Sequence, residues 1–238
     1  MQARFDDAKS KGRRNLDMKK QIFLMLTVCL LALFLSACSD AGNAFEAKTY
    51  TPEGAAIRGI SIQAADRAIQ VVPSADGQVH IDYAESAKEF YEIAVSDDGI
   101  LTMTAKSSKA WSDYIGLSPS AGADQITVHL PDAALSVLTL CTTRESITLP
   151  ALTVTDQLTL STDGGAIFFE KISAANAITL ENKNGRIVGT IVGSYDDYAI
   201  ACAIKKGKSS LPTQKSGGNK VLTVRNNNGD IDIAFVRE

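Results

Sequence analysis

The chain has 238 residues, 45% of them hydrophobic and 21% charged, which is an ordinary composition for a globular protein with one substantial core. Its formal net charge of −3 reflects an excess of acidic over basic side chains. Acidic chains lack the basic stripe that nucleic-acid binding requires, and they do not dock on anionic lipid through charge. We therefore exclude nucleic acid as a partner, and charge as the basis of membrane attachment.

The N-terminal part is organised as an export signal. Residues 22–35 (IFLMLTVCLLALFL) form an apolar run, with Lys19 and Lys20 before it and small residues after it. This order is typical of a secretory signal, and the run is shorter than the roughly 20 residues that a membrane-spanning helix needs. The last four residues of the region, 35–38 (LSAC), resemble the lipobox of bacterial lipoproteins.

That resemblance implies a diacylglyceryl thioether on Cys38, cleavage in front of Cys38, and acylation of the new amino terminus by a fatty acid such as palmitate. Two or more acyl chains hold a protein stably on a membrane, whereas one does not. We expect a signal peptide over 1–37 and a lipid-anchored protein of the bacterial cell envelope. The alternatives are an uncleaved anchor and an ordinary signal peptide in which Cys38 is incidental.

The first 17 residues are polar, of mixed charge and without an apolar pattern, whereas Met18 is followed by the two lysines that normally open such a signal. We therefore expect translation to begin at Met18. Residues 1–37 hold seven of the 24 Lys and Arg and three of the 27 Asp and Glu, which leaves 17 basic and 24 acidic side chains. The mature protein is thus expected to carry a net charge near −7.

Beyond the signal, residues 38–48 are small and polar and predict a short tether, and residues 49–238 predict one all-β domain. Stretches 60–62, 68–72 and 78–83 alternate apolar with polar residues and are separated by turns rich in Asp, Pro and Gly. Period-two alternation of this kind is typical of half-buried strands.

Residues 90–95 and 100–105 predict a hairpin around a DDG turn. The next stretch, 106–125, breaks the alternating pattern and carries Trp111 and Tyr114. Exposed aromatic side chains often contact glycans or proteins, so these two residues are candidates for a contact surface. The alternative is that they fold back as a lid over the open end of the stack described next.

From about residue 126 onward the chain repeats a phrase of strand and turn. Each phrase has an apolar-Thr-apolar core, four polar residues, and an aliphatic residue nine positions after its start. The phrases start at Leu138, Leu158, Ile178 and Leu222, and the returning residues are Ile147, Ile167, Ile187 and Ile231. The first three starts are twenty residues apart, and such a period indicates a chain that stacks on itself. We predict a single-stranded β-helix or solenoid-like stack, with a β-meander sandwich of hairpins as the alternative.

Alternation along each strand places the apolar residues of the phrase in buried columns and its threonine outside. The expected outer column consists of Thr139, Thr159, Thr179 and Thr223. A single column fits a solvated sheet face better than an ice-binding array, which needs several. Gly165, Gly185 and Gly229 share one place in the turns, where glycine tolerates a positive φ. A further coil is expected to begin near Ile200, between the third and fourth phrases, and to carry a basic loop.

The strand-rich front half, the phrase ITVHLP at 126–131, the LTL coils and the phrase NGDIDI at 228–233 together resemble a broad family of bacterial adhesin-like envelope lipoproteins. The resemblance spans roughly residues 57–235. It implies an all-β, single-stranded helical or solenoid-like fold. It supplies no catalytic residue, because the function of the family is largely uncharacterised.

Signals for catalysis or metal binding are weak in this sequence. His80 and His129 occupy the polar phase of their strands, so we expect surface residues rather than bases or metal ligands. The pairs at 196–197 and at 230 and 232 do not follow a calcium-loop spacing, and we expect structural roles for them. We therefore predict no enzymatic activity, no cofactor and no metal.

Two cysteines remain after the signal and the lipidation site, Cys141 and Cys202, and both a disulfide and two free thiols are compatible with their apolar strands. The expected function is a lipid-anchored, non-enzymatic envelope protein whose β-solenoid head contacts a protein or glycan. One alternative is an envelope-stress or signalling accessory that binds a membrane sensor in cis. The remotest alternative is a glycan-active enzyme with clustered carboxylates.

Overall fold

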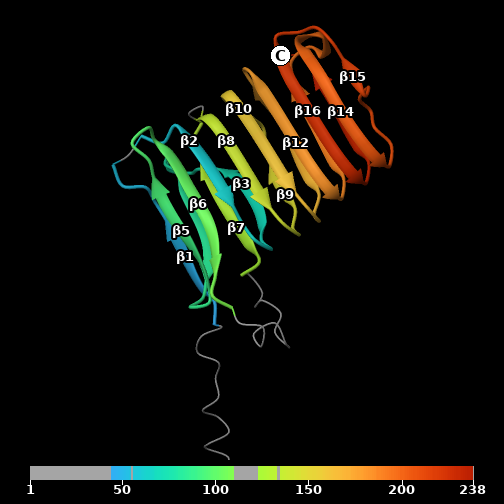
Figure 1. The fold of residues 1–238 in the computed structure, drawn as a ribbon. Coiled ribbons are helices and arrows are strands. Elements are labelled where there is room, and N and C mark those ends of the chain that lie inside the picture. Colours follow the sequence, from blue (N-terminus) through green and yellow to red (C-terminus); the bar gives the residue numbers. More distant parts are fainter. Residues whose placement is uncertain (1–43, 55, 110–122, 133–134, 238) are drawn as a thin grey trace, which may run out of the picture. The chain divides into compact units, whose positions relative to one another are not determined.

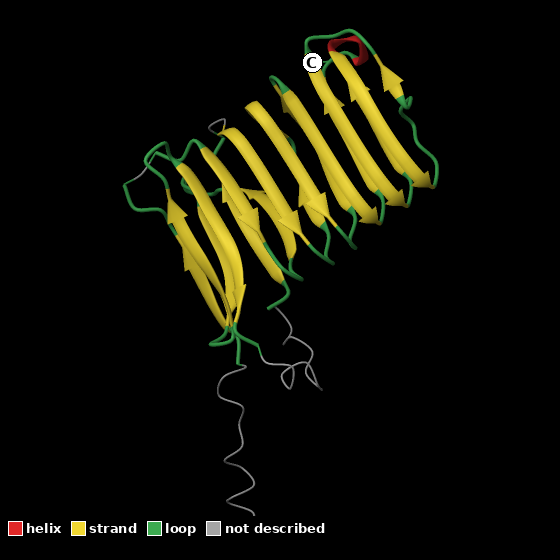
Figure 2. Ribbon diagram, in the orientation of Figure 1, coloured by secondary structure: helices red, strands yellow, loops and turns green. Residues whose placement is uncertain are grey.

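The computed structural model describes residues 44–54, 56–109, 123–132 and 135–237, all within the unit Gly42–Glu238. Figure 2 shows that these residues are almost entirely strands and turns, with the short 3-10 helix η2 as the exception. No helix among the described residues is long and apolar enough to cross a membrane. The elements are β1 (Glu46–Tyr50), β2 (Gly59–Gln63), β3 (Ala68–Pro73), β4 (His80–Glu85), β5 (Glu89–Val95), β6 (Ile100–Ser107), β7 (Gln125–Leu130), β8 (Leu135–Thr142), β9 (Ile147–Leu149), β10 (Leu152–Thr162), β11 (Ile167–Ala174), β12 (Ala177–Asn184), β13 (Ile187–Val192), η2 (Tyr195–Asp197), β14 (Tyr198–Lys206), β15 (Gln214–Lys215), β16 (Lys220–Asn228) and β17 (Ile231–Val236).

The strands form two hydrogen-bonded stacks. The first stack has the order β5, β6, β2, β8, β10, β12, β16, β14, β15, and Figure 1 shows most of these strands side by side. The second stack has the order β1, β4, β7, β3, β9, β11, β13, β17. Pairing is parallel through the interior of both stacks, and antiparallel pairs occur only at their ends. From β6 to β14 the chain therefore alternates between the stacks, as a β-solenoid does.

The repeated phrases lie in register, which confirms the solenoid prediction. Leu158 pairs with Leu138 on one side and with Ile178 on the other, and Ile178 pairs with Leu222. All four side chains are at most 1% exposed and belong to one core. The β-meander alternative is wrong, because the turn of each repeat leads to a strand of the opposite stack and the repeats pair in parallel.

The threonine column is present on the outer side of the first stack and is longer than the sequence indicated. Its members in register are Thr102, Ser61, Thr139, Thr159, Thr179 and Thr223. Thr102, at the end of the column, is exposed, and the other five are half-buried among their neighbours on the sheet face.

The spatial order of the coils differs from their order in the chain at both ends. The coil of β2 and β3 lies between that of β6 and β7 and that of β8 and β9. The coil of β16 and β17 pairs directly with β12 and β13, and β14 pairs with the far side of β16. The expected coil near Ile200 therefore exists, but it lies beyond the fourth phrase rather than between the third and the fourth.

Buried polar side chains at the start of each turn join successive coils. Thr142 Oγ1 donates to the Arg67 carbonyl at 2.7 Å and Thr162 Oγ1 to the Glu145 carbonyl at 2.8 Å. One coil further on, Asn182 Nδ2 donates to the Gly165 carbonyl at 2.8 Å, and Asn226 Nδ2 to the Gly185 carbonyl at 2.8 Å. These four bonds satisfy carbonyl groups that turns would otherwise bury unpaired.

The turns approach each other so closely that glycine is required on steric grounds. A Cβ atom on Gly185 would lie 2.1 Å from the Gly165 carbonyl oxygen, and one on Gly229 would lie 2.1 Å from that of Gly185. Gly185 and Gly229 also have positive φ, as predicted, with values of +154° and +130°. Gly165 does not have a positive φ, so the prediction was wrong there, and its Cβ position is blocked by the Glu145 backbone at 2.1 Å.

The first strand begins earlier than the sequence indicated. β1 starts at Glu46, so the last residues of the predicted tether (38–48) pair with β4, and Lys48 lies opposite Tyr83. Lys48 also forms an ion pair with Glu85 at 2.5 Å. The described fold is therefore fastened at its N-terminal edge by both backbone and side-chain contacts.

Candidate contact site

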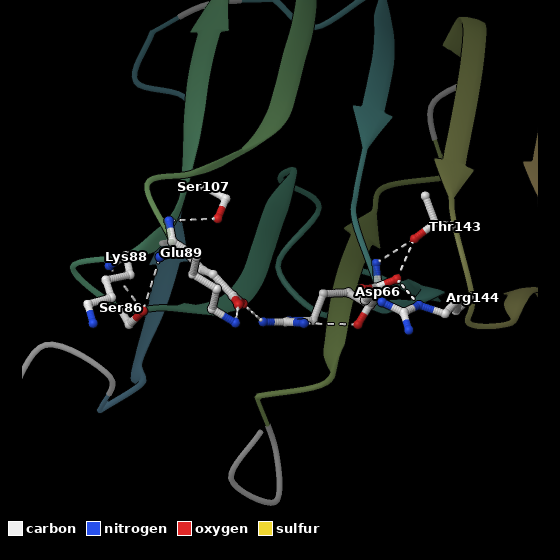
Figure 3. Close-up of polar contacts among 9 residues, drawn as sticks. Asp66, Ser86, Lys88, Glu89, Ser107, Thr143 and Arg144 are labelled. Atoms are coloured by element: carbon white, nitrogen blue, oxygen red, sulfur yellow. Dashed lines mark hydrogen bonds and ion pairs between the residues drawn. The ribbon is translucent and has the colours of Figure 1, made fainter. Parts of the chain in front are cut away.

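A groove of about 580 Å³ lies where four segments converge. They are the β2–β3 turn, the connection from β4 to β5, the end of β6 and the β8–β9 turn. Because the coil of β2 and β3 lies between two later coils, turns that are far apart in the sequence meet at this place. Figure 3 shows the polar side chains that these segments contribute.

A buried arginine anchors the groove. The Arg67 side chain is 5% exposed, and its Nη2 donates to Glu89 Oε2 at 2.5 Å, while Nη1 donates to the Asp66 carbonyl at 2.9 Å. Arg67 Nε has no hydrogen-bond partner among the described residues. Glu89 also forms an ion pair with Lys109, and the guanidinium lies 5.2 Å from the Phe45 ring centroid. One carboxylate thus contacts two cations at the base of the groove.

A second ion pair closes the neighbouring turn (Figure 3). Asp66 accepts hydrogen bonds from Arg144 Nε at 2.7 Å and from Thr143 Oγ1 at 2.5 Å, and its own amide donates to Thr143 Oγ1 at 3.0 Å. The Arg144 hydrogen bond is the main cause that lowers the pKa of Asp66, with Thr143 contributing and partial burial opposing. Asp66 has φ +55°, a conformation that Asp tolerates better than most residues.

The groove carries balanced charge and exposed aromatic surface. Its acidic lining residues are Asp66, Glu89, Asp124 and Glu145, and its basic ones are Arg67, Lys106, Lys109 and Arg144. Phe90, which is 37% exposed, and Tyr91 also line it. Equal numbers of both signs do not favour a polyanion, whereas aromatic rings beside fixed donors and acceptors suit a neutral polar ligand or a peptide.

The aromatic residues predicted to make contacts, Trp111 and Tyr114, lie outside the described residues, as does the lipidation site Cys38. The described residues that flank the segment 110–122 lie at the groove, because Lys109 and Asp124 both line it. The sequence did not reveal the role of Arg67 and Glu89, which are 22 positions apart and meet only after the chain has passed from one stack to the other.

The two histidines lie on the outer side of the second stack, directly opposite each other on β4 and β7. His80 Nε2 lies 2.7 Å from Asp76 Oδ2 and its Nδ1 lies 2.9 Å from Thr51 Oγ1, while His129 Nε2 lies 2.9 Å from Asp82 Oδ2. The pKa of Asp76 is lowered to about 2, first by the Ser74 hydroxyl and then by the Gln78 amide and His80. This network ties β1 and the turn before β4 to the sheet.

The carboxylate pairs take structural positions. Asp197 accepts from the Ser194 amide at 2.8 Å and completes the cap of η2, and Asp230 accepts from the Lys208 amide at 2.8 Å. Within the described ranges, no group of three or more His, Cys, Asp or Glu side chains could hold a metal ion.

Cys141 and Cys202 are free, so the structure favours two thiols over the disulfide. Cys202 is buried, whereas Cys141 is half-buried, and burial raises the pKa of the Cys141 thiol. A thiol whose pKa is raised is a poor nucleophile at neutral pH.

A comparison with protein-family models identifies the family of this chain. The model of the family described as Toastrack DUF4097 matches residues 57–234. The chain belongs to the Toastrack family. The match begins just before β2 and ends within β17, so it covers the parallel interior of both stacks. A comparison with curated proteins gives no match.

Solved structures of other bacterial proteins are similar to this chain at low sequence identity. A candidate cell adhesion protein from Clostridium sporogenes has a TM-score of 0.50 at 10% identity, over 81% of this chain and 99% of its own. A candidate adhesin from Bacteroides fragilis has a TM-score of 0.35 at 14% identity, over 82% of this chain and 99% of its own. A candidate adhesin from Parabacteroides distasonis has a TM-score of 0.33 at 10% identity, over 82% and 98%. At 10% identity, the similarity to the Clostridium sporogenes protein concerns the fold alone.

Proposed function

We propose that this Toastrack protein is a non-enzymatic contact protein of the bacterial cell envelope, anchored by lipid on Cys38, whose β-solenoid head binds a protein or glycan at the groove. The groove carries this proposal, because it places aromatic surface and neutralised charges at one end of the stacks. The segment that carries Trp111 and Tyr114 leaves and re-enters the described chain there, and we propose that these two side chains add to the contact surface. The fold shared with a candidate cell adhesion protein from Clostridium sporogenes is compatible with this role.

The lipid anchor can be tested by labelling cells with an alkyne analogue of palmitate. The expected result is label on the wild-type protein and on Cys29→Ala, whose cysteine lies inside the signal, and loss of label in Cys38→Ala. Equal labelling of both variants would contradict the anchor at Cys38.

The groove can be tested with a photo-crosslinking amino acid at Phe90 in intact cells, and with the same group at Thr159 on the outer column as a matched control. The proposed role predicts cross-linked products at Phe90 that are lost in Trp111→Ala and Tyr114→Ala, and no such products at Thr159. Glycan arrays with the purified head separate glycan from protein partners. Cross-linking to a single resident membrane protein would support the alternative of a sensor accessory in cis. Release of reducing ends from an array glycan would contradict the non-enzymatic proposal.

A further inference from the structure

The strand β5 ends the first stack on the side opposite to β15. Among the described residues its one hydrogen-bonded partner strand is β6, with Ile93 opposite Met103 and Val95 opposite Leu101. A terminal strand presents a row of unpaired N–H and C=O groups, which form a template for another extended chain.

The hydrogen bonds at both ends of β5 identify its outward row. The Tyr91 amide donates to Glu85 Oε2 at 3.3 Å and the Glu89 carbonyl accepts from the Ser86 amide at 2.7 Å, so both residues direct their backbone away from β6. The Ser96 amide, by contrast, donates to the Ile100 carbonyl at 3.0 Å and points toward β6. Because N–H and C=O groups alternate sides along a strand, Ile93 and Val95 direct both backbone groups outward.

The side chains of the same residues face the core. Tyr91, Ile93 and Val95 are half-buried and pack against the core cluster, whereas Phe90 and Glu92 are exposed on the outer face. A strand laid along this edge would therefore place every second side chain beside an apolar row. The chemistry that fits is an extended peptide with apolar residues at alternate positions.

At the other end of the first stack, the edge of β14 is covered. β15 pairs with β14, and the Thr213 carbonyl accepts from the Cys202 amide at 2.9 Å. At the start of β5, the Glu85 carboxylate occupies the Tyr91 amide. Within the described ranges, nothing comparable occupies the amides of Ile93 and Val95.

We propose that β5 binds an extended segment of a partner protein by strand addition from the Tyr91 carbonyl to Val95, which lengthens the first stack by one strand. Phe90 and Tyr91 also line the groove, so the docked segment would run past the proposed contact site. This inference specifies the partner class for the proposed contact function and rests on that function. The tests of strand addition probe backbone groups of β5, whereas the tests of the proposed function probe the groove side chains and the lipid anchor. Strand addition and the proposed function can therefore fail separately.

The first test is amide hydrogen exchange of the free protein followed by NMR. The amides of Ile93 and Val95 are expected to exchange without protection, while those of Phe90 and Glu92, which pair with β6, exchange slowly. Protection of Ile93 and Val95 in the free protein would overturn the proposal, because the edge would already be covered.

The second test selects linear peptides from a phage-displayed library on the wild-type protein and compares Ile93→Pro with Ile93→Ala. Both variants lose the same side-chain packing, but only proline removes the outward N–H, and proline is tolerated on an edge strand. Selected peptides should bind Ile93→Ala and lose about tenfold or more of their affinity for Ile93→Pro.

Peptide addition to the wild-type protein should also protect the Ile93 and Val95 amides, which keeps the test valid if Ile93→Pro does not fold. Equal binding of peptides to both variants, or peptides that leave these amides unprotected, would overturn strand addition. Sedimentation that shows dimers abolished by Ile93→Pro would overturn the choice of partner in favour of a second copy of this chain.

Discussion

The ion pair between Arg67 and Glu89 provides a sharp stability test. We expect Glu89→Ala to destabilise the protein strongly, because it leaves a guanidinium whose side chain is 5% exposed without its carboxylate. Removal of one partner from a buried pair costs about 3–5 kcal/mol. Glu89 is 22% exposed, so water reaches the vacated position in part, and Arg67 keeps its bond to the Asp66 carbonyl. The expected cost is therefore at the lower end, about 3 kcal/mol.

Urea denaturation followed by circular dichroism measures this cost. With a slope of about 2–3 kcal/mol per molar urea, the midpoint should fall by roughly 1–1.5 M. The matched control is Glu92→Ala, on the same strand, which removes an ion pair to Lys106 whose partners are 67% and 42% exposed. Such exposed pairs contribute about 0–1 kcal/mol, so this midpoint should hardly change.

A second substitution separates the lost attraction from the penalty of a stranded charge. Arg67→Met in the Glu89→Ala background removes the buried cation, so it should recover most of the lost stability. Equal midpoints for Glu89→Ala and Glu92→Ala would refute the reasoning. So would a double variant that is less stable than Glu89→Ala alone, because Arg67 would then stabilise the fold without its partner.

The turns and the acidic residues give three further predictions. Asn182→Ala should cost about 2–3 kcal/mol in urea denaturation, because it strands a carbonyl of the preceding turn and the amide two residues on. Gly185→Ala should cost at least about 2 kcal/mol by the same assay, since its Cβ meets a backbone oxygen at 2.1 Å, whereas Gly77→Ala, with nothing within 4 Å, should cost about 1 kcal/mol. Asp76 and Asp66 have lowered pKa values, with that of Asp76 at about 2. Their contribution is therefore present above the unfolded pKa near 3.9 and is lost as the pH falls toward about 2, so urea midpoints should drop across that window and drop less in Asp76→Asn.

The register of the repeats could be predicted because one pattern encodes both period and orientation. Leu158, Thr159 and Leu160 alternate inward and outward, and a twenty-residue spacing brings the same pattern back after one coil. A slip by one residue would expose every leucine, so the buried column fixes the pairing. The buried turn residues Thr162 and Asn182, which bond to the preceding coil, follow from the same register, although their pattern in the sequence predicts only polar turn positions.

The order of the coils and the groove could not be predicted, for a physical reason. Every inner coil offers the same rows, so Leu140 is packed as well beside Ile62 as beside Leu160, and periodicity does not identify the neighbour. The insertion of the β2 and β3 coil between later coils depends on non-local pairing. Arg67 comes beside Glu89 only as a result of that insertion, so no local pattern marks the groove.

This degeneracy also indicates where function should lie on such a fold. In the interior, each strand gives its backbone groups to two neighbours and its apolar row to the core, which leaves an outer face of small side chains such as Thr139 and Thr159. At the ends of the stacks, the last strand has a neighbour on one side only. The sequence must therefore depart from the repeat in order to cover the exposed backbone groups and the apolar row. At the C-terminal end it does so with β15 and with Leu211, which is 7% exposed. At the N-terminal end the departure consists of β5, the buried Arg67 and their groove. There, no described residue covers the outward backbone groups of Ile93. Selection for a partner can act on this edge without disturbing the stack, because neither the repeat nor the local sequence pairs its backbone groups.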